Sequence, residues 1–247
     1  MTEIKKVIEV KGLVKRFGSF VANDHLTFDV YKGEIFGFLG ANGAGKTTAI
    51  RILCGLSRPT SGTVTVAGID AGRPEEIKKR IGYMSQRFSL YDDLTVNENI
   101  ELYGGIYGMT MKEIRHRRAE LLTRLSFSQY GDTLIGSLPL GLKQKLAFAV
   151  AVFHDPEIVF LDEPTSGVDP ITRRQFWEMI YETASRGITV FVTTHYMDEA
   201  EYCDRVTIMS EGSIVALDSP AALRDRYNTA TIEELFVKIA RPKTETA

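Results

Sequence analysis

A glycine-rich segment, GANGAGKT at residues 40–47, has the residue types and spacing that bind phosphate. It matches G-x-x-x-x-G-K-[ST] in full, follows the predicted strand EIFGFL and opens the predicted helix TTAIRILCGL, which is the context that the motif requires. Its glycines permit backbone angles that turn successive N–H groups toward one point, and the helix N-terminus adds to this anion site. We therefore predict a nucleoside triphosphate site formed by Gly40, Ala41, Asn42, Gly43, Ala44, Gly45, Lys46, Thr47 and Thr48.

Three of these residues have separate expected roles. Lys46 should reach the β- and γ-phosphates, the Thr47 hydroxyl should coordinate Mg²⁺, and the Thr48 amide should add a phosphate contact. The alternative is a glycine-rich turn with a chance lysine, which leaves the flanking strand and helix unexplained. By itself, the motif predicts triphosphate binding and no particular family.

Two acids end the apolar strand in EIVFLDEP at 157–164. In a parallel sheet, ligands gather at the carboxyl ends of the strands, so Asp162 is placed to hold Mg²⁺ through water. Glu163 points in another direction and is expected to orient and deprotonate an attacking water. The alternative is an acidic loop after a core strand.

Two further polar residues are expected at this edge. His195 follows the predicted strand ITVFVTT and is a candidate sensor of the γ-phosphate, although a lone histidine is more often structural. Gln86 lies in GYMSQRFSLYDDLTV, where the sheet region gives way to helices. A glutamine there can ligate Mg²⁺ or water, whereas without that context it is an ordinary surface residue.

The elements that must position these residues predict an α/β fold. VIEVKGLVKRF, LTFDVYKG and TVTVAG are typical of strands, and the near-continuous apolar strands predict a parallel sheet covered on both faces. A helix-rich middle spans roughly 95 to 154 and begins at a capping box of Thr95 and Glu98. Asp169 and Pro170 predict another helix start, and Gly187 its end. The order indicates a helical insertion in a sheet-based domain.

Composition excludes several classes of function. The apolar content of 44% and charged content of 25% are ordinary for a globular protein, and the net charge of −2 offers no global field for nucleic acid or anionic lipid. Cys54 and Cys203 lack CxxC spacing and are expected to be reduced, structural thiols of a cytosolic protein. MTEIKKVIEV lacks the apolar run of a signal peptide, and no apolar stretch is long enough to span a bilayer. At a membrane, another chain would supply the spanning part.

Together these motifs resemble the nucleotide-binding subunit of an ATP-binding cassette (ABC) transporter, over about residues 7 to 240. GANGAGKT looks like the Walker A motif, Gln86 like the Q-loop glutamine and IVFLDEP like Walker B with its catalytic Glu163. SGVD at 166–169 looks like the D-loop with Asp169, and His195 looks like the switch histidine. Phe17 takes the place of the aromatic that stacks on adenine, or else it is a packing aromatic.

The runs TTHYMDEAEYCDRV and TIEELFVKIA are similar to the ABC-2 branch, which is mostly exporters, and to the second cassette of tandem ATPase subunits of the YbhF type. The resemblance implies a P-loop NTPase (RecA-like) core with an N-terminal antiparallel β subdomain and a helical insertion. Residues 1–88 and 155–220 would form the ATP-binding core with the β subdomain, 89–154 a helical subdomain carrying the signature segment, and 221–247 a C-terminal helical tail.

The resemblance also implies a mechanism with ATP and Mg²⁺. Two cassettes, as a homodimer or a heterodimer, would close head to tail over two ATP molecules at the cytoplasmic face of the cell membrane and drive two membrane-spanning permease subunits, without nucleic acid. Glu163 would be the general base, with Gln86, His195 and Asp169 arranging the site. Residues 86–110 would form the groove for the membrane partner, with candidate aromatics Phe88, Tyr91, Tyr103 and Tyr107.

The signature segment departs from the family pattern LSGGQ. The chain has Pro139 and Leu140 where the family has serine and glycine, and it keeps Gly141. Pro139 has neither a hydroxyl nor an N–H, so a missing donor to the partner's phosphate would cost roughly 1.5–3 kcal/mol. Pro139 and Gly141 stay in the predicted nucleotide site; the alternative is a segment that serves packing only.

Two other functions remain open. One is an ABC ATPase of translation, DNA repair or chromosome structure, although no coiled coil, zinc motif or basic linker is visible in the sequence. The other is a nucleotide-binding regulator with little hydrolysis, which the altered signature favours and the intact Glu163 and His195 oppose.

Overall fold

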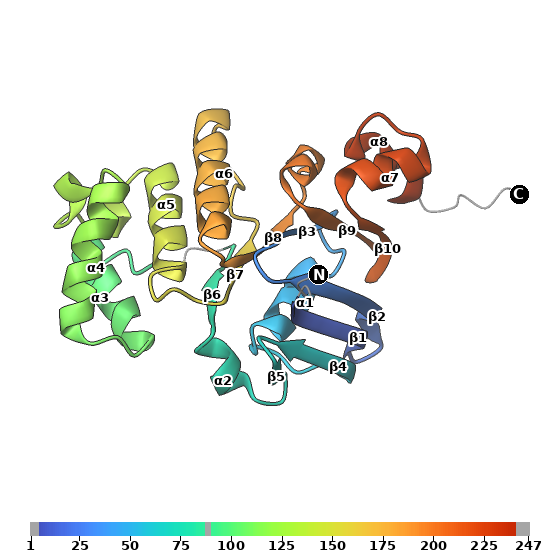
Figure 1. Cartoon of the computed structure of the whole chain (residues 1–247), viewed down its shortest axis with the longest axis horizontal. Coiled ribbons are helices and arrows are strands. Elements are labelled where there is room, and N and C mark those ends of the chain that lie inside the picture. Colours follow the sequence, from blue (N-terminus) through green and yellow to red (C-terminus); the bar gives the residue numbers. More distant parts are fainter. Residues whose placement is uncertain (1–4, 87–89, 241–247) are drawn as a thin grey trace, which may run out of the picture.

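Two sheets of different type form the centre of the chain, which the structure, a computed structural model, describes at residues 5–86 and 90–240 (Figure 1). The first has four antiparallel strands in the order β2-β1-β4-β5, and the second has six in the order β10-β9-β3-β8-β7-β6. From β9 to β6 the neighbours are parallel, and β10 runs antiparallel at the edge. The strands are β1 Lys6–Phe17, β2 Phe20–Tyr31, β3 Ile35–Gly40, β4 Ser61–Val66, β5 Ile69–Asp70, β6 Ile81–Met84, β7 Ile158–Asp162, β8 Thr189–Thr194, β9 Arg205–Ser210 and β10 Ser213–Asp218.

The helices surround these sheets. In Figure 1, α3 and α4 lie at one end of the long axis, and α7 and α8 lie at the other. The α-helices are α1 Lys46–Leu53, α2 Pro74–Lys78, α3 Val96–Ile106, α4 Met111–Arg124, α5 Leu140–Ala151, α6 Pro170–Ser185, α7 Pro220–Tyr227 and α8 Ile232–Ala240. Among the described residues there are also three 3₁₀ turns: η1 Ser128–Tyr130 and η2 Ile135–Ser137 lie between α4 and α5, and η3 Met197–Tyr202 lies between β8 and β9.

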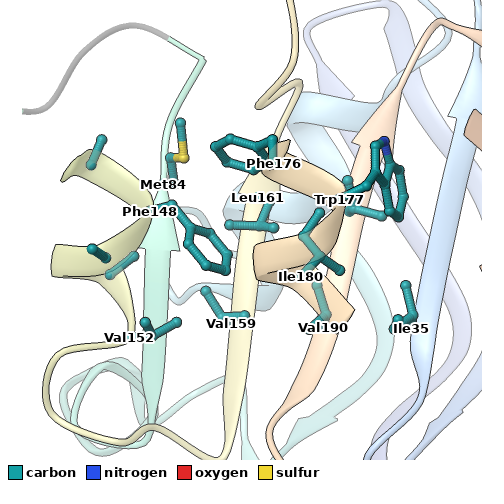
Figure 2. Close-up of a cluster of buried hydrophobic side chains, with 14 of the residues drawn as sticks. Ile35, Met84, Phe148, Val152, Val159, Leu161, Phe176, Trp177, Ile180 and Val190 are labelled. Atoms are coloured by element: carbon teal, nitrogen blue, oxygen red, sulfur yellow. The ribbon is translucent and has the colours of Figure 1, made fainter. Parts of the chain in front are cut away.

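The six-stranded sheet is buried on both faces. Successive side chains of a strand point to opposite faces, so each central strand contributes to two cores. From β3, Phe36 and Phe38 enter the core shared with α1 and the four-stranded sheet, while Ile35 and Leu39 enter the core shared with α5 and α6. Figure 2 shows the second core, where side chains of α5 and α6 lie against those of β7 and β8. The predicted parallel sheet with two covered faces is confirmed.

Several predicted helix ends are also confirmed. Thr95 and Glu98 form a complete capping box at α3, and the Asp169 carboxylate accepts the first free N–H groups of α6. Gly187, at φ 86°, follows the end of α6. The predicted end of one helix was wrong. The predicted helix TTAIRILCGL extends to residue 56, whereas α1 ends at Leu53, because Gly55 adopts φ 68° and leaves the helical conformation.

Two predictions from composition concern the cysteines and the absence of a membrane-spanning stretch. Cys54 and Cys203 are both buried and both free of disulfides. Within residues 5–86 and 90–240, no helix has the length and apolar content needed to cross a bilayer.

Candidate nucleotide site

The glycine-rich loop between β3 and α1 is fixed against β2. Gly45 has φ 99°, and a Cβ placed on it would lie 2.3 Å from the Ala22 carbonyl oxygen and 2.7 Å from Asn23 Nδ2. The buried Asn23 donates from Nδ2 to the Gly45 carbonyl at 3.1 Å. Glycine is therefore required at this position for both its backbone angle and its space. Asn23 was not among the predicted site residues, since its contact with Gly45 is non-local.

The start of α1 presents free backbone donors. The first helical bond runs from the Ala49 N–H to the Gly45 carbonyl at 3.0 Å, so the N–H groups of Lys46, Thr47 and Thr48 precede it without a helical acceptor. These donors and the helix dipole make an anion site at the end of the loop.

Lys46 is buried inside this loop, with 4% of the residue exposed. Its Nζ donates to the carbonyls of Gly40 at 2.7 Å and Ala41 at 3.1 Å. Burial lowers the pKa of Lys46, and the nearby Glu163 carboxylate opposes that shift. The ammonium is thus held at the mouth of the loop by acceptors that a phosphate group can replace.

The two acids at the end of β7 are positioned by one hydroxyl from β8. Thr193 donates from Oγ1 to Asp162 Oδ1 at 2.7 Å and accepts the Glu163 N–H at 3.0 Å. Glu163 has φ 50°, a left-handed conformation uncommon outside glycine, and this angle turns it out of the strand. Thr193 was not among the predicted site residues, although its hydroxyl two residues before His195 on a central strand was a usable signal.

Four predicted site residues meet at the Glu163 carboxylate. Its Oε1 lies 3.5 Å from Lys46 Nζ, and its Oε2 accepts Gln86 Nε2 at 2.9 Å. His195 Nδ1 lies 3.0 Å from the same Oε2, so the ring carries a proton on Nδ1 when it donates there. The carboxylate itself is almost fully buried. The structure therefore places Lys46, Gln86, Glu163 and His195 in one cluster.

Thr47 and Asp162 have the chemistry of a magnesium site. Thr47 Oγ1 lies 3.5 Å from Asp162 Oδ1, and both are hard oxygen donors. Burial raises the pKa of Asp162, the Thr193 hydrogen bond lowers it, and the Glu163 charge raises it again. Since two carboxylates here face one ammonium, a divalent cation fits the local charge.

Two predicted residues lie apart from this cluster. Asp169 uses its carboxylate to accept the N–H groups of Ile171 and Thr172, both at 3.0 Å, and the Thr172 hydroxyl, and these bonds hold its pKa low. Phe17, at the end of β1, is 56% exposed, with Lys15 Nζ 5.0 Å from its ring centroid. It is not a buried packing aromatic.

The signature segment lies against the loop that carries Asp169. Pro139 is the N-cap of α5, and a Cβ on Gly141 would lie 2.9 Å from Thr172 Cγ2. Leu140 is 43% exposed and lies near Gly167. The structure does not bring Pro139 or Gly141 to the phosphate loop of this chain by any hydrogen bond among the described residues.

A groove lies between α2 and the end of α3. Its volume is about 570 Å³, and it is lined by Cys54, Leu56, Glu75, Lys78, Lys79, Ile81, Tyr83, Ile106, Tyr107 and Gly108. Of the predicted groove aromatics, Tyr107 lines it, Tyr103 packs against the core and Tyr91 is exposed. Phe88 lies outside the described residues.

The fold and this cluster define an ATP-binding domain of the P-loop NTPase class. Residues 23–166 match the family model described as ABC transporter. The chain belongs to the ABC transporter family of ATP-binding domains, as the sequence resemblance predicted.

Three relatives place the chain within this family. It is 44% identical over 94% of its length to the "Probable multidrug ABC transporter ATP-binding protein YbhF" of Escherichia coli, but spans only 41% of that protein. It is 37% identical over 94% of its length to the "Nod factor export ATP-binding protein I" of a Rhizobium species, covering 77% of it. A solved dimeric ATP-binding cassette with bound ADP and Pi has a TM-score of 0.78 at 26% identity, over 86% of this chain and 98% of that one.

Proposed function

We propose that this chain binds and hydrolyses ATP and thereby powers an exporter of the ABC family. The observation that carries the proposal is the buried Glu163 carboxylate, which is contacted by Lys46, Gln86 and His195 beside Asp162. A carboxylate held in this way beside an anion-binding loop has the surroundings of a general base for water. A purely nucleotide-binding role does not require this arrangement.

ATP would lie with its phosphates over the start of α1. The N–H groups of the loop, among them those of Lys46, Thr47 and Thr48, and the Lys46 ammonium would bind the phosphate oxygens, and Phe17 would stack on adenine. Thr47, Asp162 and Gln86 would hold Mg²⁺, which neutralises charge on the phosphates when bound. Lys46 would exchange its bonds to the Gly40 and Ala41 carbonyls for bonds to phosphate oxygens.

Hydrolysis would use the partners of Glu163. The carboxylate would take the proton of the attacking water, while Gln86 and His195 fix its orientation from the other side. His195 donates to Glu163 through Nδ1, so its free Nε2 can donate to a phosphate oxygen only when the ring carries both protons. Asp169 would act indirectly by fixing the start of α6.

The test is steady-state ATP hydrolysis by Glu163→Gln. We expect turnover to fall by about 10²–10⁴-fold, the usual contribution of a general base, with ATP binding retained. Glu157→Gln is the matched control, because Glu157 precedes the other end of β7 and pairs with Arg80 at the surface. Hydrolysis that is unchanged in Glu163→Gln would refute the assignment of the base.

Export through separate membrane subunits is supported by the names of the relatives, which refer to multidrug transport and Nod factor export. The chain would lie at the cytoplasmic face of the membrane, with two permease subunits and a second cassette. The groove between α2 and α3 would receive a cytoplasmic helix of the permease, since exposed Leu56 and Ile106 offer apolar area beside Lys78 and Lys79.

Purification of the complex from membranes tests this part. Membrane-spanning chains should co-purify with the wild type and be lost with Ile106→Glu, while ATP binding is retained. Val237→Glu on α8 is the control, because Val237 is also an exposed apolar residue but lies away from the groove. Recovery of ribosomes without a membrane chain would refute the exporter assignment.

A further inference from the structure

An acid outside the site described above is buried without full hydrogen bonding. Glu199, in η3, has no exposed surface, and its Oε1 accepts the Thr165 hydroxyl at 2.6 Å. Its Oε2 has no hydrogen-bond partner among the described residues. A buried carboxylate with an unsatisfied oxygen is costly, so its place in the fold needs a physical explanation.

Arg173 of α6 faces this acid and the residues around it. Its Nε lies 3.8 Å from Glu199 Oε1 and, within the described chain, also lacks a hydrogen-bond partner. Its guanidinium carbon is 4.2 Å from the Tyr196 ring centroid, and its NH1 is 3.5 Å from Asp198 Oδ2. Arg173 thus contacts three of the four residues that follow His195, namely Tyr196, Asp198 and Glu199.

The positions of these residues connect two parts of the site. Thr165 comes two residues after Glu163, and Arg173 comes four residues after Asp169. Glu199 comes four residues after His195. The Thr165 hydrogen bond and the Arg173 contacts therefore join the loop from Glu163 to Asp169 with the segment that follows His195.

The C-terminal helix α8 also packs against η3. Ile232 and Leu235 of α8 are buried in the same core cluster as Ala200 and Cys203, at the end of η3. Besides the direct contact of Glu163 with His195, the Thr165 hydrogen bond and the Arg173 contacts give the 163–169 loop a second connection to the segment that follows His195.

We propose that Glu199, through Thr165 and Arg173, is a positioning residue that couples the Glu163–Asp169 loop to the His195 segment. The proposal rests on the proposed ATPase function. Glu199 touches no reacting group itself. It transmits the position of the loop, because displacement of Thr165 would leave the buried Glu199 carboxyl group without the one hydrogen bond that the described residues give it.

The test is Thr165→Val, which removes the hydroxyl and keeps the volume. Turnover of ATP should fall by about tenfold, as for other residues that orient catalytic groups, while KM for ATP stays unchanged. Thr165→Ser keeps the hydroxyl and should restore turnover. Thr207→Val is the matched control, because Thr207 is equally buried on β9 but its hydroxyl has no partner among the described residues.

Two measurements separate positioning from general destabilisation. In a His195→Ala background, Thr165→Val should have little further effect on turnover, since the coupled residue is already absent. Amide hydrogen exchange of residues 195–202 should rise in Thr165→Val and not in Thr207→Val, which tests the coupling even when the His195→Ala variant is inactive.

Unchanged exchange at 195–202, or a turnover loss that Thr165→Ser does not restore, would overturn the proposal. If Glu163→Gln hydrolyses ATP like the wild type, the proposed ATPase function fails instead. The two failures are therefore distinguishable in one set of variants.

Discussion

Replacing Thr193 by valine removes one buried hydroxyl that serves both acids of the site. The hydroxyl donates to Asp162 at 2.7 Å and accepts the Glu163 N–H at 3.0 Å, and Thr193 has no exposed surface. One bond goes to a charged acceptor and one to a backbone donor, so together they contribute roughly 2–4 kcal/mol. For a chain of this size, each 1 kcal/mol shifts Tm by roughly 2–4 °C. We therefore expect a fall in Tm of roughly 4–16 °C.

Function should change as well as stability. Loss of a residue that orients a metal ligand typically costs about 10–100-fold in metal affinity or activity. A titration of Mg²⁺ at fixed ATP should show this loss in Thr193→Val, and thermal unfolding gives the stability. Thr207→Val is again the control, because its hydroxyl has no partner in the described part of the chain. An equal Tm and an equal Mg²⁺ dependence in Thr193→Val and Thr207→Val would refute this role of the Thr193 hydroxyl.

Two other predictions concern parts of the fold away from Thr193. Burial lowers the pKa of His154, which stacks on Tyr107, to about 4, so the unfolded chain binds the extra proton below about pH 6.5. The free energy of unfolding should therefore fall, by at most about 3 kcal/mol, as the pH is lowered from 6.5 to 4. Urea titrations at several pH values should show a smaller fall in His154→Gln. An equal fall in the wild type and in His154→Gln would contradict this prediction. Restoring Pro139→Ser with Leu140→Gly should change ATP-driven association of cassettes and leave ATP affinity of the monomer unchanged, as nucleotide titration and light scattering can show. Altered monomer affinity would mean that the segment serves its own chain.

The phosphate loop and the strands around it could be predicted because their signals are local. A strand, a glycine-rich turn and a helix follow one another over residues 35–53, and each has its own pattern. The ends of β7 and β8 were predictable in the same way. Short or weakly patterned elements were not predicted, including β5, α2, β6, β9 and β10.

The contacts that complete the site depend on sheet register, which the local pattern does not contain. Asp162 lies opposite Thr193 in the pairing of β7 with β8, and this register brings the hydroxyl to both acids. Asn23 reaches Gly45 from β2 across the phosphate loop. Gln86 was predicted to lie near the site from its sequence context, but only the structure shows its hydrogen bond to Glu163.

The signature segment of this chain accommodates both of its departures from the family pattern. Pro139 fits the N-cap of α5, where φ is −55° and no helical N–H is required, and Leu140 occupies the first turn with 43% of its surface exposed. The fold of this chain therefore tolerates both residues at little cost. Gly141 differs, because a side chain there would meet Thr172. In the proposed dimer, the consequences of Pro139 and Leu140 fall on the nucleotide of another cassette. Two identical copies would have both sites altered, whereas pairing with a different cassette would confine the alteration to one.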